Sequence, residues 1–150
     1  MKSKEHIKET LRKLFASQNL AVLATQYAGE PYTSLVAFAA TEDLKQLFFV
    51  TGQSTRKYAN LRADSRAAML IDNRSNEASD VAHATAATVM GIAEAVPDDE
   101  TKVLGQLYLK KHPHLKEFMD SPSTVFVKLR VERYYVVSRF QEVTELRVTP

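Results

Sequence analysis

Three short apolar runs near the start of the chain, separated by brief turns, constrain the fold most strongly. They are residues 20–25 (LAVLAT), 32–40 (YTSLVAFAA) and 47–51 (LFFVT). The segments AGEP and TEDLKQ between them are typical of turns. Apolar runs of this length with so little chain between them predict a meander of antiparallel strands.

Three later segments extend this β pattern. Residues 66–73, 84–96 and 123–140 are rich in β-branched, aromatic or alternating apolar residues. Gly91 interrupts the second of them, which predicts a bulge or a close backbone approach. The last predicts one bent strand or two. Six to seven strands with few helices to cover two faces indicate a closed or nearly closed antiparallel barrel.

Three helices and one short helical turn complete the prediction. The helices cover residues 3–17, capped by Ser3, residues 54–63 and residues 97–111, and the turn covers residues 114–120. The third helix begins with acids and ends with lysines, as the helix dipole favours. Its residues expected to face the core are Val103, Leu104, Leu107 and Tyr108. The fold class is therefore mainly β (α+β), with peripheral helices, in a single domain over residues 1–150.

Composition excludes several classes of function. The chain has no cysteine, which rules out disulfides, thiol catalysis and iron–sulfur ligation. Its four glycines are too sparse for a dinucleotide or Walker loop. A net charge of +2 is too small for a typical nucleic-acid binder. The chain has neither an apolar run of about 18 residues nor the apolar core of a signal peptide, so we expect a cytoplasmic protein without a membrane partner.

The stretch TGQSTRKYANL, residues 51–61, contains an electrostatic conflict. It reads as a turn and a helix, with Arg56 and Lys57 in the first helical turn. Cations are disfavoured there, at a cost of about 0.3–1 kcal/mol, because the helix dipole places partial positive charge at that end. Either both side chains point into water and the cost is tolerated, or the helix start binds an anion.

An anion site uses every residue type in this stretch. Free backbone N–H groups at a helix start attract phosphate, and Ser54 and Thr55 add hydroxyl donors. Arg56 binds two oxygens with its planar guanidinium, whereas Lys57 acts as a point charge. Gly52 lets the turn bring its backbone close to a ligand.

The longer segment FFVTGQSTRKYANLRADSRAAMLIDN resembles the core signature of the FMN-binding split-barrel proteins, the pyridoxamine phosphate oxidase-like superfamily. The matching pieces are Val-Thr at 50–51, Thr-Arg-Lys at 55–57, Asn-Leu at 60–61 and Arg66 before an apolar strand. The preceding hairpin and the later strand VMGIAEAV are also similar, so the resemblance covers residues 10–96 well and the remainder loosely.

This resemblance implies a six- to seven-stranded antiparallel split β-barrel that forms a homodimer with FMN at the subunit interface. The FMN phosphate would sit on Arg56 and Lys57, with Ser54 or Thr55. Groups of the second and third strands would line the ribityl chain and ring. These are Ser34, Leu35, Val36, Val50 and Thr51. No catalytic acid or base and no metal site is implied.

The implied activity is that of an oxidoreductase on an unknown small molecule, with a small-molecule electron donor and acceptor. The C-terminal segment does not match the substrate-phosphate contacts of the true oxidases, which argues against vitamin B6 oxidation. Two alternatives stay open. One is a non-catalytic flavin or haem carrier or sensor. The other is a deazaflavin-dependent reductase, whose cofactor tail calls for more basic residues than the sequence assigns.

Other candidate residues have simpler explanations. His112 and His114 are expected in an exposed loop that ends a helix, because no further metal ligands lie near them in sequence. His83 is expected to be an ordinary loop histidine. The Ser-x-x-Lys spacing of Ser54 and Lys57 lacks the supporting motifs of an acyl enzyme. In the segment RYYVVSRF, Arg139 or Tyr134 is a weak candidate to reach a cofactor across an interface.

Overall fold

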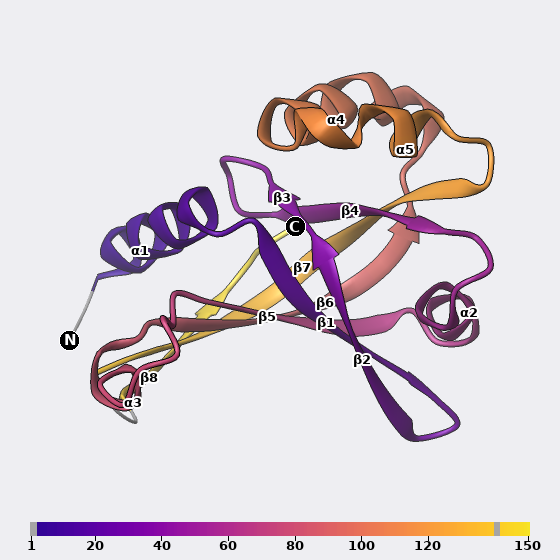
Figure 1. The fold of residues 1–150 in the computed structure, drawn as a ribbon. Helices are drawn as coiled ribbons and strands as arrows, with labels where there is room; N and C mark the ends of the chain where they lie inside the picture. Colours follow the sequence, from indigo (N-terminus) through magenta and orange to yellow (C-terminus); the bar gives the residue numbers. More distant parts are fainter. Residues whose placement is uncertain (1–2, 140–141) are drawn as a thin grey trace.

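The computed structural model describes residues 3–139 and 142–150, and it shows a strongly curved antiparallel sheet with helices around it (Figure 1). The strands are β1 (Leu20–Tyr27), β2 (Glu30–Ala37), β3 (Ala39–Ala40), β4 (Gln46–Gly52), β5 (Arg66–Asp72), β6 (Ala86–Ala95), β7 (Thr124–Ser138) and β8 (Glu142–Arg147). The helices are α1 (Lys4–Ser17), α2 (Arg56–Ala63), α3 (Asp80–His83), α4 (Asp98–Lys111), the 3-10 turn η1 (Pro113–Leu115) and α5 (Lys116–Asp120).

The strand order makes the sheet an almost closed barrel. The strands run β2-β1-β5-β6-β7-β4-β3, every pairing is antiparallel, and β8 pairs with the outer part of β7. β2 and β3 lie at opposite edges, yet only Phe38 separates them in the chain. The chain therefore crosses from one edge to the other within one residue, and this crossing closes one end of the barrel.

The other end stays split. β4 pairs with β3 only at Leu47 and Phe48, and β2 pairs only with β1. β2 and β4 nevertheless approach each other, with Cα atoms within 8 Å. The facing edges of these two strands are therefore adjacent without pairing as strands.

The main core fills the inside of the barrel. Inward side chains of β1, β4, β5, β6 and β7 pack there against one face of α1, whose buried residues are Ile7, Leu11, Leu14 and Phe15. Ser3 caps this helix by accepting a hydrogen bond from the backbone N–H of His6 at 3.2 Å, as the sequence predicts. Nearly all of this core is aliphatic or aromatic, so burial of apolar surface holds the barrel together.

Gly91 allows the barrel wall to bend. The register between β6 and β7 shifts between Met90 and Gly91, which confirms the predicted irregularity. A Cβ atom at this position would lie 2.3 Å from the carbonyl oxygen of Arg130, closer than any side chain tolerates. β7 itself continues through the bend as one strand.

Helix α4 covers the outside of β3, β4 and β7. Its buried residues Leu104 and Tyr108 pack on Phe48 and Val50 in a second apolar cluster. Glu100 in its first turn binds the buried Lys128 of β7, with Nζ 2.8 Å from Oε1. The prediction that Val103 and Leu107 also face the core was wrong, because the helix is rotated so that these side chains are 61% and 40% exposed.

The last turn of α4 faces inward instead, and this corrects the prediction that His112 lies in an exposed loop. His112 is 2% exposed, and its Nε2 lies 2.7 Å from the carbonyl oxygen of Phe38. Burial lowers the pKa of His112. The carbonyl can only accept, so the neutral ring carries its hydrogen on Nε2 and donates it. His114 is exposed on η1, as predicted.

Tyr108, one turn before His112, bridges the two edges of the split. Its hydroxyl donates to the carbonyl of Ala37, the last residue of β2, at 2.9 Å. Burial raises the pKa of Tyr108 to about 12. The Tyr108 ring packs in the same apolar cluster as Phe48 and Val50 of β4, so this side chain contacts two strands that do not pair there. Tyr108 and His112 together hold the crossing at residues 37–38.

The predicted fold class, a mainly β antiparallel barrel with peripheral helices, is confirmed. The structure adds β8, and it divides the predicted strand at residues 32–40 into β2 and the short β3, which brings the described strands to eight. It also places His83, expected in a loop, at the end of the short helix α3. These elements are short or polar, so periodicity gives little sign of them. Among residues 3–139 and 142–150, no helix is both long and apolar enough to cross a membrane.

The bridge predicts a specific loss of stability. Tyr108→Phe keeps the ring but leaves the Ala37 carbonyl without this buried partner. We expect the free energy of unfolding to fall by about 1–3 kcal/mol, measured by urea denaturation. Tyr58→Phe is the matched control, because the Tyr58 hydroxyl makes no hydrogen bond within the described part of the chain. Equal effects of the two substitutions would contradict the bridge.

Candidate functional site at the split of the barrel

The start of α2 is built as the sequence predicts, with one adjustment. The helix begins at Arg56, its N-cap is Thr55, and its first turn contains no acid. The hydroxyl of Thr55 accepts from the backbone N–H of Tyr58 at 3.3 Å. Ser54 is an exposed turn residue rather than the cap. Arg56 and Lys57 therefore do occupy the first turn.

The turn before α2 is hydrogen-bonded both to the helix start and to the segment before β7. The hydroxyl of Thr55 also donates to the carbonyl of Gly52 at 2.9 Å and lies 3.2 Å from the hydroxyl of Thr51. The backbone N–H of Gln53 donates to the carbonyl of Ser123, just before β7, at 2.9 Å. These contacts fix the position of the helix start relative to the sheet.

The two cations of the first turn have no protein partner. Within the described residues, neither Arg56 nor Lys57 forms an ion pair or a side-chain hydrogen bond. Arg56 is exposed and Lys57 is half-buried. Two unpaired cations beside the positive end of a helix dipole give this point a locally positive potential that suits an anion.

The far end of α2 fixes the helix against β1. The buried side chain of Asn60 donates from Nδ2 to the hydroxyl of Thr25 at 3.1 Å. Asp64, which follows the helix, is bound by Arg66 with Nη2 2.7 Å from Oδ2, and by Gln26. These contacts, chiefly the one with Arg66, lower the pKa of Asp64 to about 2. This carboxylate is thus engaged at the opposite end of α2 from Arg56 and Lys57.

The predicted residues of β2 divide between the two faces of the sheet. Ser34 and Val36 pair with Leu23 and Ala21 on the inner face, whereas Leu35 pairs with Val22 on the outer face and is 62% exposed. The hydroxyl of Ser34 is buried and has no hydrogen-bond partner. A buried hydroxyl without a partner is costly, so Ser34 offers an unused polar group beside the split.

The predicted residues of β4 present backbone rather than side chains. Val50 is 8% exposed and packs under α4, and Thr51 is 2% exposed with its hydroxyl turned to Thr55. Beyond Phe48, β4 has no strand partner on the β3 side. The structure thus brings together the facing edges of β2 and β4, and α2 lies against β1 and β2.

These residues supply binding groups rather than an acid–base pair. Of the nine predicted site residues, only Arg56 and Lys57 carry charge, and both are cations. Within the described parts of the chain, no group of three or more His, Asp and Glu side chains is arranged to hold a metal ion. The arrangement suits a ligand with an anionic end at α2 and a less polar body along the split.

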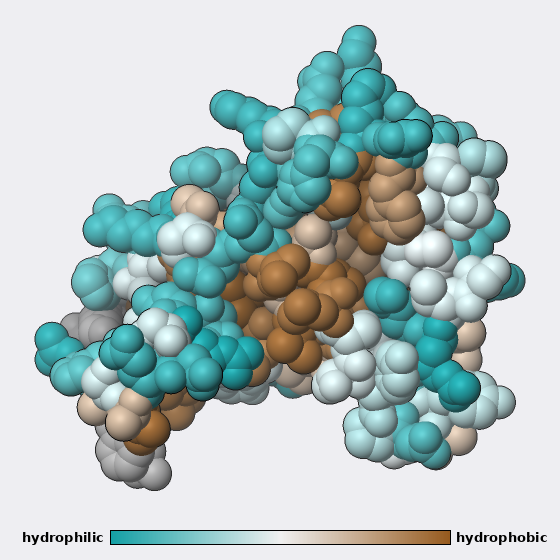
Figure 2. All heavy atoms as spheres, viewed as in Figure 1, coloured by the Kyte–Doolittle hydropathy of each residue, from teal (hydrophilic) through white to brown (hydrophobic). Residues whose placement is uncertain are grey.

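Two features of this region went unrecognised in the sequence. One is Tyr108, whose apolar helical position gave no sign that its hydroxyl bridges the split. The other is an exposed apolar surface that we call the outer patch, made of Leu20, Val22, Leu35 and Leu70. Figure 2 shows hydrophobic side chains gathered over β1, β2 and β5 in the middle of the molecule.

The structure places three further candidates away from the split. Tyr134 is fully buried, and its hydroxyl donates to the carbonyl of Leu44 at 2.6 Å, so it does not reach out of the molecule. Arg139 is exposed and has a positive φ of 50°. His83 ends the short helix α3 and is exposed.

Comparisons with known proteins agree with this architecture. Residues 7–138 match the family model described as pyridoxamine 5'-phosphate oxidase. A haem-binding protein from Mycobacterium smegmatis is 25% identical, with a TM-score of 0.83, over 93% of this chain and 57% of that protein. The chain thus spans little more than half the length of this relative. No curated protein matches the chain.

Two further solved structures share the fold at lower identity. A FAD-binding protein from Mesorhizobium loti is 17% identical, with a TM-score of 0.68, over 85% of this chain and 90% of that one. HutZ, the haem storage protein from Vibrio cholerae, is 18% identical, with a TM-score of 0.68, over 93% of this chain and 96% of that one. Similarity at this level supports the fold.

The charges of α2 predict that acidic substitutions at its two ends change the stability of the protein in opposite directions. In ligand-free protein, Arg56→Glu places an acid where the helix dipole favours one and removes a cation that it disfavours. We expect the free energy of unfolding to rise by about 0.5–2 kcal/mol at low ionic strength. The matched control is Arg62→Glu in the last turn, which should lower it. Urea denaturation measures both, and a loss of stability in Arg56→Glu would contradict this account.

Proposed function

The chain belongs to the pyridoxamine 5'-phosphate oxidase family, and from this premise we propose that it is a flavoprotein that binds FMN in the split between β2 and β4. The observation that carries the proposal is the pair of unpartnered cations at the start of α2. The phosphate of FMN supplies the negative charge that Arg56 and Lys57 lack, and it converts an unfavourable helix start into a favourable one.

The residues present fit the whole cofactor. The hydroxyl of Ser34 is buried without a partner and is available to a polar group of the ribityl chain or ring. Open backbone at Val50 and Thr51 provides further hydrogen-bonding groups on the opposite side. The exposed Ser54 adds a hydroxyl beside Arg56 and Lys57, whereas the hydroxyl of Thr55 is already committed to the helix cap. A flat ring between strand edges with a charged tail at a helix start is a sensible arrangement for a mixed apolar and anionic ligand.

We propose an oxidoreductase role with a small-molecule substrate. Bound flavin supplies hydride and electron-transfer chemistry, and the protein provides position and electrostatics. In this role α2 fixes the phosphate, the edges of β2 and β4 align the ring, and Tyr108 fixes the spacing of these edges. The residues at the split include no acid–base pair, so the protein's contribution is binding and orientation. The alternative is a carrier whose bound flavin does not react. Reduction of the bound flavin by nicotinamide donors would distinguish an enzyme from this carrier.

Haem is the second candidate ligand, because two of the similar structures are a haem-binding and a haem storage protein. Haem iron needs an axial ligand, most often histidine. The chain has four histidines. His112 uses its Nε2 to hold Phe38, and His6, His83 and His114 lie on α1, α3 and η1 rather than on the strands of the split. The site therefore favours flavin.

We also propose a homodimer formed through the outer patch. Leu20, Leu35 and Leu70 are exposed on one face of β1, β2 and β5, although a monomer would gain by burying them. Leu35 and Ser34 are neighbours on β2 that face opposite sides of the sheet, so a second copy on the outer patch would meet the flavin at the open edge of β2. The flavin would then be enclosed between subunits.

Flavin titration tests the proposal. FMN added to purified protein should bind with quenching of its fluorescence. Arg56→Ala combined with Lys57→Ala removes two charge-assisted contacts of about 1.5–3 kcal/mol each, and should weaken binding about tenfold or more. Arg62→Ala, on the same helix but in its last turn, should leave affinity nearly unchanged. Absence of FMN binding, or equal losses in both variants, would overturn the proposal.

A parallel titration with haemin separates the two ligands. If the protein binds haemin with a shifted Soret band but does not quench FMN, the site is a haem site. Riboflavin, which lacks the phosphate of FMN, should bind the native protein much more weakly than FMN does. The affinities of FMN and riboflavin should be similar in the variant with Arg56→Ala and Lys57→Ala, because the phosphate then has no cationic anchor.

Sedimentation measures the assembly. Leu35→Asp places a charge in the centre of the outer patch and should shift the protein from dimer to monomer. Val103→Asp is the matched control, since Val103 is also an exposed aliphatic residue but lies on α4. A monomeric native protein, or dissociation of both variants alike, would contradict an interface at this patch.

A further inference from the structure

Helix α2 buries few apolar side chains. Among the described residues of this helix, only Asn60 and Leu61 are buried, and one of the two is polar. Tyr58 is half-buried and packs against the main core. Because so little apolar surface is available to fix this helix, its position depends strongly on its polar contacts.

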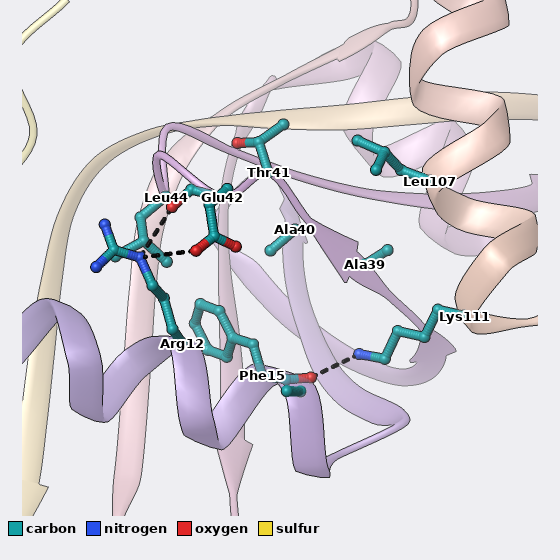
Figure 3. A pocket seen from close by; sticks show the side chains of 10 residues that line it. Arg12, Phe15, Ala39, Ala40, Thr41, Glu42, Leu44, Leu107 and Lys111 are labelled. Carbon is teal, nitrogen blue, oxygen red and sulfur yellow. Dashed lines mark hydrogen bonds and ion pairs between the residues drawn. The ribbon is translucent and has the colours of Figure 1, made fainter.

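Helix α1 illustrates the opposite case. Its buried residues Ile7, Leu11, Leu14 and Phe15 are all apolar. A polar contact is added at its last turn, where Nζ of Lys111 donates to the carbonyl of Phe15 at 2.8 Å beside a cavity of about 160 Å³ (Figure 3). This hydrogen bond supplements a helix face that is already fixed by apolar packing.

Asn60 provides the buried polar contact of α2. It is 3% exposed, and its Nδ2 donates to the hydroxyl of Thr25 in β1 at 3.1 Å. Thr25 is also 3% exposed. If the helix moved, both groups would lose their hydrogen bond without gaining access to water, and an unpaired buried polar group is costly. The contact therefore favours one position of α2 on β1.

A single helical turn separates this contact from the two cations of α2. Asn60 follows Arg56 by four residues and Lys57 by three, so the three residues lie within about 6 Å along the helix axis. Over so short a distance the hydrogen-bonded backbone moves as one piece. A shift of Asn60 relative to β1 therefore moves Arg56 and Lys57 with it.

The strand that holds Asn60 is also joined to the other end of the proposed site. β1 contains Thr25 and pairs along its whole length with β2, which carries Ser34. Gln26, next to Thr25, contacts Asp64 just after α2, and its Oε1 accepts a hydrogen bond from the backbone N–H of Gly29 at 2.9 Å. Side chains of β1 thus join α2 to the hairpin of β1 and β2.

We propose that Asn60 is a positioning residue of the flavin site, an inference that rests on the function proposed above. Its hydrogen bond to Thr25 sets the distance between the cations of α2 and the edge of β2. That distance must match the length of the ribityl chain between the ring and the phosphate of FMN. Asn60 thereby makes the site selective for the phosphorylated flavin, and it acts through Arg56 and Lys57 rather than by contact with the ligand.

The affinities for FMN and riboflavin, each measured by quenching of flavin fluorescence, test this role. Asn60→Leu keeps a side chain of similar size but removes the amide, and Thr25→Val removes the hydroxyl. Each should weaken FMN binding about tenfold, as expected when a charge-assisted contact is lost, and should change riboflavin binding less than about twofold. The two substitutions combined should be no worse than either alone, because they remove the same contact.

Two controls separate positioning from general stability, with circular dichroism showing that each variant is folded at the temperature of the titration. Thr25→Ser retains a hydroxyl and should keep the native preference for FMN over riboflavin. Leu14→Ala removes apolar packing of α1. It should lower the free energy of unfolding but leave the preference for FMN unchanged.

The outcomes distinguish this role from the phosphate site itself. A native protein that binds FMN no more tightly than riboflavin would overturn both. If the native protein prefers FMN, and Arg56→Ala with Lys57→Ala removes that preference but Asn60→Leu does not, only the positioning role is overturned. Equal loss of the preference in Leu14→Ala and Asn60→Leu also overturns it, because reduced stability would then explain both.

Discussion

The crossing of the chain at Phe38 is the constraint on which the rest of the structure depends. Because β2 and β3 belong to opposite edges, the barrel closes only if the chain turns sharply between them. Two side chains of α4 hold that turn through the carbonyls of Ala37 and Phe38. The same contacts keep β2 and β4 near each other without pairing. The closed end and the split end of the barrel thus both result from this crossing.

The charges in the first turn of α2 are unfavourable for the helix itself but suit the proposed anionic ligand. α4 follows the dipole rule, with acids in its first turn and lysines in its last. α2 departs from it with Arg56 and Lys57. The two helices belong to one small domain, so the difference is not explained by a general tolerance of charge. Unpaired cations at a helix start beside an open strand edge support the proposal that this point binds an anionic ligand.

Much of this was predictable from local signals. The hairpin of β1 and β2, the cations in the first turn of α2 and the irregularity at Gly91 each follow from a few neighbouring residues. The predicted three-strand meander was wrong, because the second strand splits at Phe38 between the two edges of the sheet. The inward turn of His112 was not predictable, because it depends on how α4 is rotated against β3 and β4. The same rotation exposes Val103 and Leu107, which helical periodicity alone assigns to the core. Likewise, the hydroxyl of Ser34 is buried without a partner because of what packs on the inner face of the sheet, which its local sequence does not reveal.

The pairing of β7 has a consequence for how the chain reaches this structure. Leu129 of β7 pairs with Leu47 of β4, more than half the chain away, and β7 also pairs with β6 and β8. Contacts so distant in sequence require loop closure before they bring any gain. Folding dominated by them is slow, on the millisecond to second scale. During synthesis, β4 therefore cannot pair with β7 until nearly the whole chain has been made.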